Sequence, residues 1–163
     1  PLRAAVITLS DKGSRGERED KSGPLIAQML TAAGYVVEET MILPDEAKAL
    51  KAQLIRMADG RQVNLVLTTG GTGFSPRDIT PEATCAVADR NAPGIAEAMR
   101  YHSLSITPRG MLSRGVSVLR GKTLIVNLPG SPKAVQENLE YILPSLEHGV
   151  RIAAGLDGEC ARK

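Results

Sequence analysis

The sequence predicts an α/β fold, a single compact domain in which helices flank both faces of a mostly parallel sheet. Short apolar segments rich in β-branched residues alternate along the chain with segments whose apolar residues recur at helical spacing. Strands separated by helices in this order favour parallel pairing, with the connecting helices packed on both faces. We expect residues 1–163 to form one domain with a short polar tail at residues 157–163, because a chain of this length can bury one core.

The first predicted strand and helix are separated by a charged loop. Residues 2–9 are apolar apart from Arg3, which is typical of a strand buried on both faces. Residues 10–21 are polar and charged and predict a loop. A helix is then expected from Ser22 to Gly34, because apolar residues recur at helical spacing and glycine often ends a helix.

Two more strands and one helix complete the first half of the chain. Residues 35–43 predict the second strand, and Asp45 is placed to cap a helix that continues to about residue 58. Residues 63–69 are apolar and β-branched. They predict a third strand that leads directly into the glycine-rich residues 70–73.

In the second half of the chain, two helices begin with a capping residue followed by proline, at Thr80-Pro81 and at Ser131-Pro132. The first of these helices is expected to end near Asp89. The last should be kinked or interrupted at Pro144, because proline removes a helical hydrogen bond. The remaining predicted elements are a helix at residues 93–102 and strands at residues 115–119 and 122–128, separated by a tight turn at residues 120–121.

Composition argues against several classes of function. The formal net charge is +2 and aromatic residues make up 2% of the chain, so we expect no binding of nucleic acid through charge or base stacking. No apolar run approaches the ~20 residues that span a bilayer, so we expect no membrane association. Cys85 and Cys160 are too few for a disulfide framework, which favours a cytoplasmic location, and Cys85 is expected to pack as a small apolar residue.

Three loops rich in small and charged residues predict a shared site, at residues 10–21, 70–78 and 129–133. Ligands of parallel sheets bind at the carboxyl ends of strands, where such loops converge. The glycines of residues 70–73 let backbone N–H groups approach an anion, next to the positive end of the following helix. The stretch matches neither common nucleotide-binding pattern, since no lysine follows it and Pro76 stands where a third glycine is required. The same glycines are also consistent with a plain strand-to-helix connection.

Asp78 predicts a metal ion in this site. A carboxylate repels a polyphosphate by about 1 kcal/mol per charge pair at ~4 Å in water, and by about 4 kcal/mol at an effective dielectric constant of ~20. A divalent cation between them removes this repulsion, and Mg²⁺ commonly binds one or two carboxylates together with phosphate oxygens. Asp45 is the candidate second ligand, and Arg77 is the candidate phosphate ligand. In the alternative interpretation, Asp45 is only a helix cap, and Arg77 and Asp78 are solvated loop charges or Asp78 caps the next helix.

Other polar residues of these loops are candidate ligands or plain turn residues. In the first loop they are Ser10, Asp11, Asp20 and Ser22. The corner at residues 129–132 presents backbone N–H groups at a helix start, which suits an anionic or polar ligand as well as a simple turn. His102 and His148 have no partners at the spacing of a metal site, and neither cysteine has a partner set for nucleophilic catalysis.

Five motifs, taken together, carry a resemblance to a known family. They are GGTGFSPRDITPEAT at residues 70–84, Ser10-Asp11, Pro44-Asp45, MLSR at residues 111–114 and LIVNLPGSPKA at residues 124–134. With them the chain closely resembles the molybdopterin adenylyltransferase family, which includes the bacterial enzyme and the G domains of plant and animal molybdenum-cofactor proteins such as gephyrin. The resemblance extends from Leu2 to about Gly155, and its longest motif is the most specific.

The resemblance implies a compact α/β domain, usually a homotrimer, that acts late in molybdenum-cofactor synthesis. Such an enzyme uses Mg²⁺ and ATP to transfer AMP to the terminal phosphate of molybdopterin, releases pyrophosphate, and hands its product to a protein that inserts molybdate. By motif, the catalytic aspartates are Asp45 and Asp78. The phosphate-binding turn corresponds to Gly70, Gly71, Thr72, Gly73 and Ser75. Positions that line the nucleotide and pterin pocket correspond to Ser113, Arg114, Asn127, Gly130 and Ser131.

The chemistry implied by the resemblance agrees with the residues present. Nucleotidyl transfer needs no protein nucleophile, because the substrate phosphate itself attacks the α-phosphorus of ATP. Two other functions stay open at this point. One is a non-catalytic module of the same fold that binds molybdopterin or a partner protein, against which the aspartates at the metal positions argue. The other is a related domain acting on a different nucleotide, against which the LPGSPKA segment argues.

Overall fold

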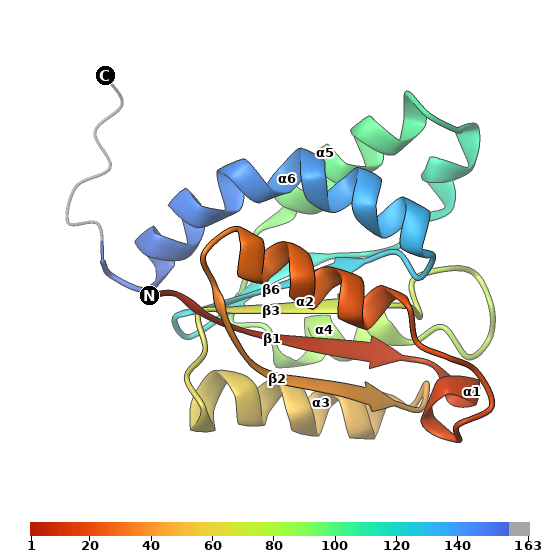
Figure 1. Cartoon of the computed structure of the whole chain (residues 1–163), viewed down its shortest axis with the longest axis horizontal. Coiled ribbons are helices and arrows are strands. Elements are labelled where there is room, and N and C mark those ends of the chain that lie inside the picture. Colours follow the sequence, from red (N-terminus) through yellow and green to blue (C-terminus); the bar gives the residue numbers. More distant parts are fainter. Residues whose placement is uncertain (157–163) are drawn as a thin grey trace.

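Six strands form one sheet at the centre of the computed structural model, which describes residues 1–156 (Figure 1). They are β1 (Arg3–Leu9), β2 (Val36–Leu43), β3 (Leu65–Thr69), β4 (Arg90–Asn91), β5 (Ser117–Arg120) and β6 (Thr123–Leu128). Their order across the sheet is β2-β1-β3-β6-β5-β4. β2, β1, β3 and β6 are parallel, whereas β5 and β4 are antiparallel to their neighbours. The predicted α/β class with a mostly parallel sheet is confirmed, and the predicted tail lies outside the described residues.

Helices cover both faces of the sheet, as predicted. They are α1 (Asp11–Ser14), α2 (Ser22–Ala32), α3 (Ala47–Ile55), the π-helical turn η1 (Arg56–Gly60), α4 (Thr80–Val87), α5 (Pro93–Leu104), the 3₁₀ turn η2 (Pro108–Leu112) and α6 (Pro132–Ala153). Figure 1 shows α2, α5 and α6 on one face and α3 and α4 on the other. Each layer of helices encloses its own apolar cluster against the sheet.

β1 shows why the sheet is buried on both sides. Its residues alternate between the two clusters, with Ala4 and Val6 facing one and Ala5, Ile7 and Leu9 facing the other. Side chains of a strand point alternately to opposite faces, so a strand covered twice has to be apolar throughout. This interior position places the end of β1, and the loop after it, between the ends of β2 and β3.

The predicted final helix is correct, and of the two expected effects of Pro144, a kink or an interruption, the interruption does not occur. α6 continues through Pro144, although this residue has no N–H to donate to the preceding turn. Leu139, Ile142 and Leu146 are buried on either side of it, and Val150 is buried further along. Packing of this apolar stripe on the sheet therefore offsets the cost of about 3 kcal/mol that proline carries inside a helix.

Three smaller features differ from the sequence-based expectations. The predicted first loop contains the short helix α1, and β4 and η2 have no predicted counterpart. Cys85 is exposed and does not pack as a small apolar residue, because the helix α4 that carries it buries the opposite stripe. Cys160 lies outside the described residues. Every helix within residues 1–156 is too short or too polar to cross a membrane.

Candidate functional site

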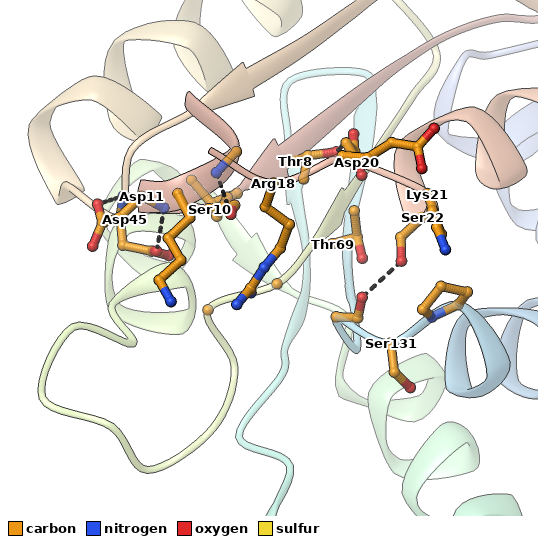
Figure 2. A pocket seen from close by; sticks show the side chains of 18 of the residues that line it. Thr8, Ser10, Asp11, Arg18, Asp20, Lys21, Ser22, Asp45, Thr69 and Ser131 are labelled. Carbon is orange, nitrogen blue, oxygen red and sulfur yellow. Dashed lines mark hydrogen bonds between the residues drawn. The ribbon is translucent and has the colours of Figure 1, made fainter. Parts of the chain in front are cut away.

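The carboxyl ends of β1, β3 and β6 open into a cavity of about 710 Å³, a size typical of small-molecule sites (Figure 2). The chain leaves β1 towards β2 and later returns to β3 on the other side of β1. The cavity thus lies at the point where the strand order reverses, the place where ligands bind in open α/β sheets. All three predicted loops contribute to its wall.

Eight of the predicted site residues line this cavity. They are Ser10, Asp11, Asp45, Gly70, Gly71, Asp78, Gly130 and Ser131. Thr72, Gly73, Ser75 and Arg77 belong to the same loops but lie outside the cavity wall. Ser113 and Asn127 line a second, smaller cavity, whereas Arg114 lines neither.

The turn after β3 requires glycine at two successive positions. Gly70 and Gly71 have φ values of +93° and +72°, a region that other residues rarely adopt. A Cβ atom at Gly70 would collide with the carbonyl oxygen of Leu9, and one at Gly71 would collide with Oγ1 of Thr80. The Thr80 hydroxyl donates to the Gly70 carbonyl oxygen at 3.0 Å, so it fixes this turn and is not the cap of α4.

The turn leaves one backbone donor available at the cavity. The Gly70 N–H donates to the carbonyl oxygen of Leu128 at 3.3 Å, which ties the turn to β6. The Gly71 N–H has no acceptor within residues 1–156, although Gly71 lines the cavity. An unpaired N–H group at a ligand-sized cavity is suited to an anionic oxygen.

Asp45 holds a carboxylate oxygen that has no donor. Its Oδ2 accepts from the Asp11 N–H at 3.1 Å, while its Oδ1 is buried and has no hydrogen-bond donor within residues 1–156. Burial raises the pKa of Asp45, and the neighbouring carboxylates of Asp11 and Asp78 raise it further. The capping interpretation of Asp45 is not supported, because α3 begins after Glu46 and has no side-chain cap.

Asp78 lines the same cavity as Asp45 and Gly71. Its Oδ2 accepts from the Ser75 N–H at 3.0 Å. Asp78 thus closes a turn within residues 70–78, here called the glycine loop, and does not cap α4. Within residues 1–156 no group of three or more acidic, histidine or cysteine side chains is arranged around a metal position. Two carboxylates with one unsatisfied buried oxygen fit Mg²⁺, which takes few protein ligands and completes its shell with phosphates and water.

Arg77 is engaged with the first loop. Its guanidinium donates to both carboxylate oxygens of Asp11, at 2.8 and 3.0 Å, and its side chain is 57% exposed. This bidentate pair lowers the pKa of Asp11 to about 2. The assignment of Arg77 as a phosphate ligand stays a prediction.

Arg114 and Asn127 hold the walls of the site in place. The Arg114 guanidinium donates to the carbonyl oxygens of Gly73 and Asp78, both at 2.8 Å, and pairs with Glu82. The amide of Asn127 is buried and donates to the hydroxyls of Thr68 and Thr84, and its Oδ1 accepts from the Val116 N–H. Both residues have a visible positioning role, and their predicted ligand contacts stay predictions.

The corner between β6 and α6 is held by hydroxyl groups. Thr69 donates to the carbonyl oxygen of Pro129 at 2.6 Å. Ser22 donates to the carbonyl oxygen of Gly130 at 2.7 Å (Figure 2). The Ser131 hydroxyl accepts from the Ala134 N–H, which confirms the predicted cap of α6. One face of this corner borders the large cavity, and Pro129 also borders the second cavity of about 180 Å³.

Several cavity residues were not identified from the sequence as site residues. They are Thr8, Leu9, Lys12, Gly13, Arg18, Glu19, Asp20, Lys21, Ser22, Thr69 and Pro132, of which the sequence indicates only Asp20, Ser22 and the corner residue Pro132 as candidates. Most of them belong to the first loop, where basic and acidic residues alternate closely in sequence. Such a loop looks like an ordinary solvated segment, and only the fold shows which of its side chains face the cavity.

Comparisons by sequence and by structure both find proteins that bind or synthesise molybdopterin, or are related to those that do. Residues 5–148 match the family described as "Probable molybdopterin binding domain". The chain is 45% identical over 143 residues to molybdopterin adenylyltransferase of Escherichia coli (strain K12), covering 86% of this chain and 73% of that protein. It is 41% identical over 155 residues to gephyrin of Dictyostelium discoideum, covering 89% of this chain and 21% of gephyrin. The crystal structure of the molybdopterin biosynthesis enzyme MoaB from Thermus thermophilus is similar with a TM-score of 0.90 and 46% identity, covering 95% of this chain and 98% of that one.

Proposed function

This chain belongs to the molybdopterin adenylyltransferase family, and from that premise we propose that it transfers AMP from Mg-ATP to the terminal phosphate of molybdopterin, with release of pyrophosphate. The observation that carries this proposal is the buried Oδ1 of Asp45, which has no donor and lies close to Asp78 at the edge of a ligand-sized cavity. A buried polar atom without a partner costs roughly 1–3 kcal/mol, and more when it is charged. A bound cation would remove this cost.

The protein groups have to position two phosphorylated substrates and stabilise charge. Asp45 and Asp78 would hold Mg²⁺, which supplies charge neutralisation for the leaving pyrophosphate. The free N–H of Gly71 would donate to a phosphate oxygen beside these carboxylates. Attack by the substrate phosphate requires correct alignment rather than a protein nucleophile, and a rigid turn supplies this alignment at no entropic cost during the reaction.

The second cavity is the proposed place of the pterin. It lies between α5, η2 and α6 and is lined by Ser113 and Asn127 together with Arg100, which donates to the carbonyl oxygen of Gly115 at 2.7 Å. Pro129 lines it, and the next residue, Gly130, lines the large cavity. A ligand that places its pterin here and its phosphate over Gly130 would meet the nucleotide at this corner.

The direct test is incubation of the purified protein with molybdopterin and Mg-ATP, followed by detection of pyrophosphate and of the adenylylated product. We expect both products in equal amounts, and neither when molybdopterin is left out. Addition of EDTA at saturating ATP should abolish turnover, and undiminished activity would refute the metal assignment. Tight binding of molybdopterin without either product would identify the chain as a non-catalytic binding module.

Assembly into a homotrimer is part of the same proposal. Large apolar side chains are exposed along α5 and the segment after it, a feature that often marks a protein interface. They are Tyr101, Leu104, Ile106, Met111 and Leu112. Sedimentation should give a trimer for the unmodified protein and a smaller species for Tyr101→Glu, with an unchanged circular dichroism spectrum. A trimer that survives this substitution would exclude Tyr101 from the interface.

Two further parts of the proposal follow from the expected reaction. The adenylylated product would be handed to a protein that inserts molybdate, and the reaction would take place in the cytoplasm. A pull-down of molybdate-inserting protein with the trimer, and fractionation of cells that express the chain, would test these points.

A further inference from the structure

Three of the four basic side chains of the first loop line the large cavity without acidic partners. Lys12, Arg18 and Lys21 all line it, and none of the three forms an ion pair within residues 1–156. Acidic residues are close in sequence, since Glu17 and Glu19 flank Arg18. A solvated loop with this composition would be expected to pair its charges locally, so the unpaired cations need another explanation.

Arg15 shows what local pairing looks like in the same loop. Its guanidinium pairs with Glu17 at 2.7 Å, and Arg15 does not line the cavity. Arg18, three residues later, has no such contact and lies at the cavity between the Asp11–Asp45 pair and the Ser22–Ser131 side (Figure 2). Of these two arginines of one loop, Arg15 therefore forms a surface ion pair and Arg18 lines the cavity.

The loop that carries these cations is anchored on both sides of the cavity. The Asp20 carboxylate accepts from the Thr8 hydroxyl at 2.8 Å and from the Gly23 N–H at 3.0 Å, which fixes the loop to β1 and α2. At the other end, Asp11 is tied to Asp45 and Arg77. Arg18 is therefore presented from a loop of restricted freedom, which lowers the entropic cost of binding a ligand.

The charges of the cavity wall show what is missing. Asp45 and Asp78 together balance one divalent cation, which leaves the negative charge of a nucleotide polyphosphate without a positively charged side chain to pair with. Two guanidinium nitrogens of Arg77 are already paired with Asp11, so this side chain offers less of the required positive charge. The unpaired side chains on the cavity wall that carry the required sign are those of the first loop.

We propose that Arg18, supported by Lys12, binds the β- and γ-phosphates of ATP, the part that leaves as pyrophosphate. This inference rests on the proposed function and assigns the anion-binding half of that site to the first loop. Arginine is suited to the role because its planar guanidinium donates to two phosphate oxygens at once. AMP lacks these phosphates, so Arg18 distinguishes ATP and pyrophosphate from AMP.

Titration calorimetry with Mg-ATP, Mg-pyrophosphate and AMP tests this assignment. We expect Arg18→Ala to weaken binding of ATP and pyrophosphate by roughly 10- to 100-fold, the effect of one lost hydrogen bond to a charged group, and to leave AMP nearly unchanged. Arg18→Lys should recover part of the loss. Arg15→Ala removes the same charge from the same loop and should leave all three affinities unchanged.

Three results would overturn the proposal. They are unchanged binding of ATP and pyrophosphate in Arg18→Ala, an equal loss in Arg15→Ala, and an equal loss for AMP. A loss confined to molybdopterin would instead assign Arg18 to the phosphate of that substrate. These measurements need no turnover, so a protein that binds pyrophosphate through Arg18 but forms no adenylylated product would refute the proposed function and leave this assignment standing.

Discussion

The glycine loop and the first loop face each other across the cavity, and they contribute to it in opposite ways. The glycine loop acts through its backbone, which is fixed by two left-handed glycines, and through the acidic side chain of Asp78. The first loop acts through side chains, chiefly the unpaired Lys12 and Arg18. The side chains suited to a cation, Asp45 and Asp78, and those suited to an anion, Lys12 and Arg18, thus come from segments far apart in sequence. The complete site exists only when the sheet has brought β1 and β3 together.

One ion pair joins the two loops, and in it the glycine loop supplies the basic residue and the first loop the acidic one. Arg77 of the glycine loop pairs with Asp11 of the first loop, so each loop lends the other a charge of the opposite sign. The pair uses the one arginine of the glycine loop and keeps Asp11 ionised. It also places Asp11 against Asp45, whose Oδ2 it holds through a backbone N–H. The crossing pair therefore orients the acidic side of the site.

Replacing one of the two carboxylates proposed to bind the cation should lower the activity more than any other change considered. Asp45→Asn and Asp78→Asn should each lower adenylyl transfer by roughly 10²- to 10³-fold or more, the range for loss of an electrostatic stabiliser. Their melting temperatures should stay close to that of the unmodified protein, because asparagine keeps the oxygen that accepts from Asp11 or Ser75. The unloaded Asp45→Asn protein should even be stabilised, since a buried charge is removed.

Steady-state rates and calorimetric melting curves check this prediction. Asp59→Asn is the matched control, because Asp59 is a surface aspartate that pairs with Arg120 away from the cavity. Unfolding of Asp78→Asn would show that this residue is structural and that its assignment as a metal ligand is wrong.

A smaller effect is expected at the backbone of the glycine loop. Gly71→Ala should weaken ATP binding by roughly tenfold or more, because the turn that presents the Gly71 N–H must move to avoid Thr80. It should also destabilise the fold by about 1–3 kcal/mol through strain at a positive φ. Gly34→Ala separates the two effects, since Gly34 also has a positive φ, of +96°, but has open space around its Cα. Unchanged ATP affinity in Gly71→Ala would remove the phosphate role of this turn.

The smallest effect should come from the crossing ion pair. Arg77→Ala should change the melting temperature little near neutral pH, because exposed ion pairs contribute little to stability. The pKa of Asp11 should rise from about 2 towards its ordinary value of 3.8. The stabilisation from a lowered carboxyl pKa is present above 3.8 and is lost as the pH falls towards 2, so the variant should lack this part of the acid dependence. NMR titration of Asp11 measures the shift, and an unmoved pKa would contradict the role of Arg77.

The parts of the molecule that depend on local sequence were predicted well. Alternating strands and helices predicted the parallel sheet, and the run of glycines after β3 predicted the turn at the cavity. Ser131 was predicted as a cap because capping depends on residues three positions apart. The boundaries of most elements differed only by a few residues at their ends, where several conformations compete.

The parts that depend on long-range contacts were not accessible from the sequence. Asp45 lines the cavity and accepts from the Asp11 N–H, 34 positions away, and does not cap a helix. Arg77 and Arg18 are both arginines in polar loops, and only the fold shows that one is paired and the other faces the cavity. Pro144 was misjudged for the same reason, because tertiary packing of α6 outweighs a local helix breaker.

The donorless oxygen of Asp45 has a consequence for how long the protein survives in a cell. A ligand that supplies a partner to this oxygen would bind the folded chain and not the unfolded one. The free energy of unfolding would then rise with the logarithm of the ligand concentration. Copies starved of nucleotide and magnesium would open more often and be degraded sooner by proteases. The abundance of this protein would then follow the supply of its own substrates, with no dedicated sensor.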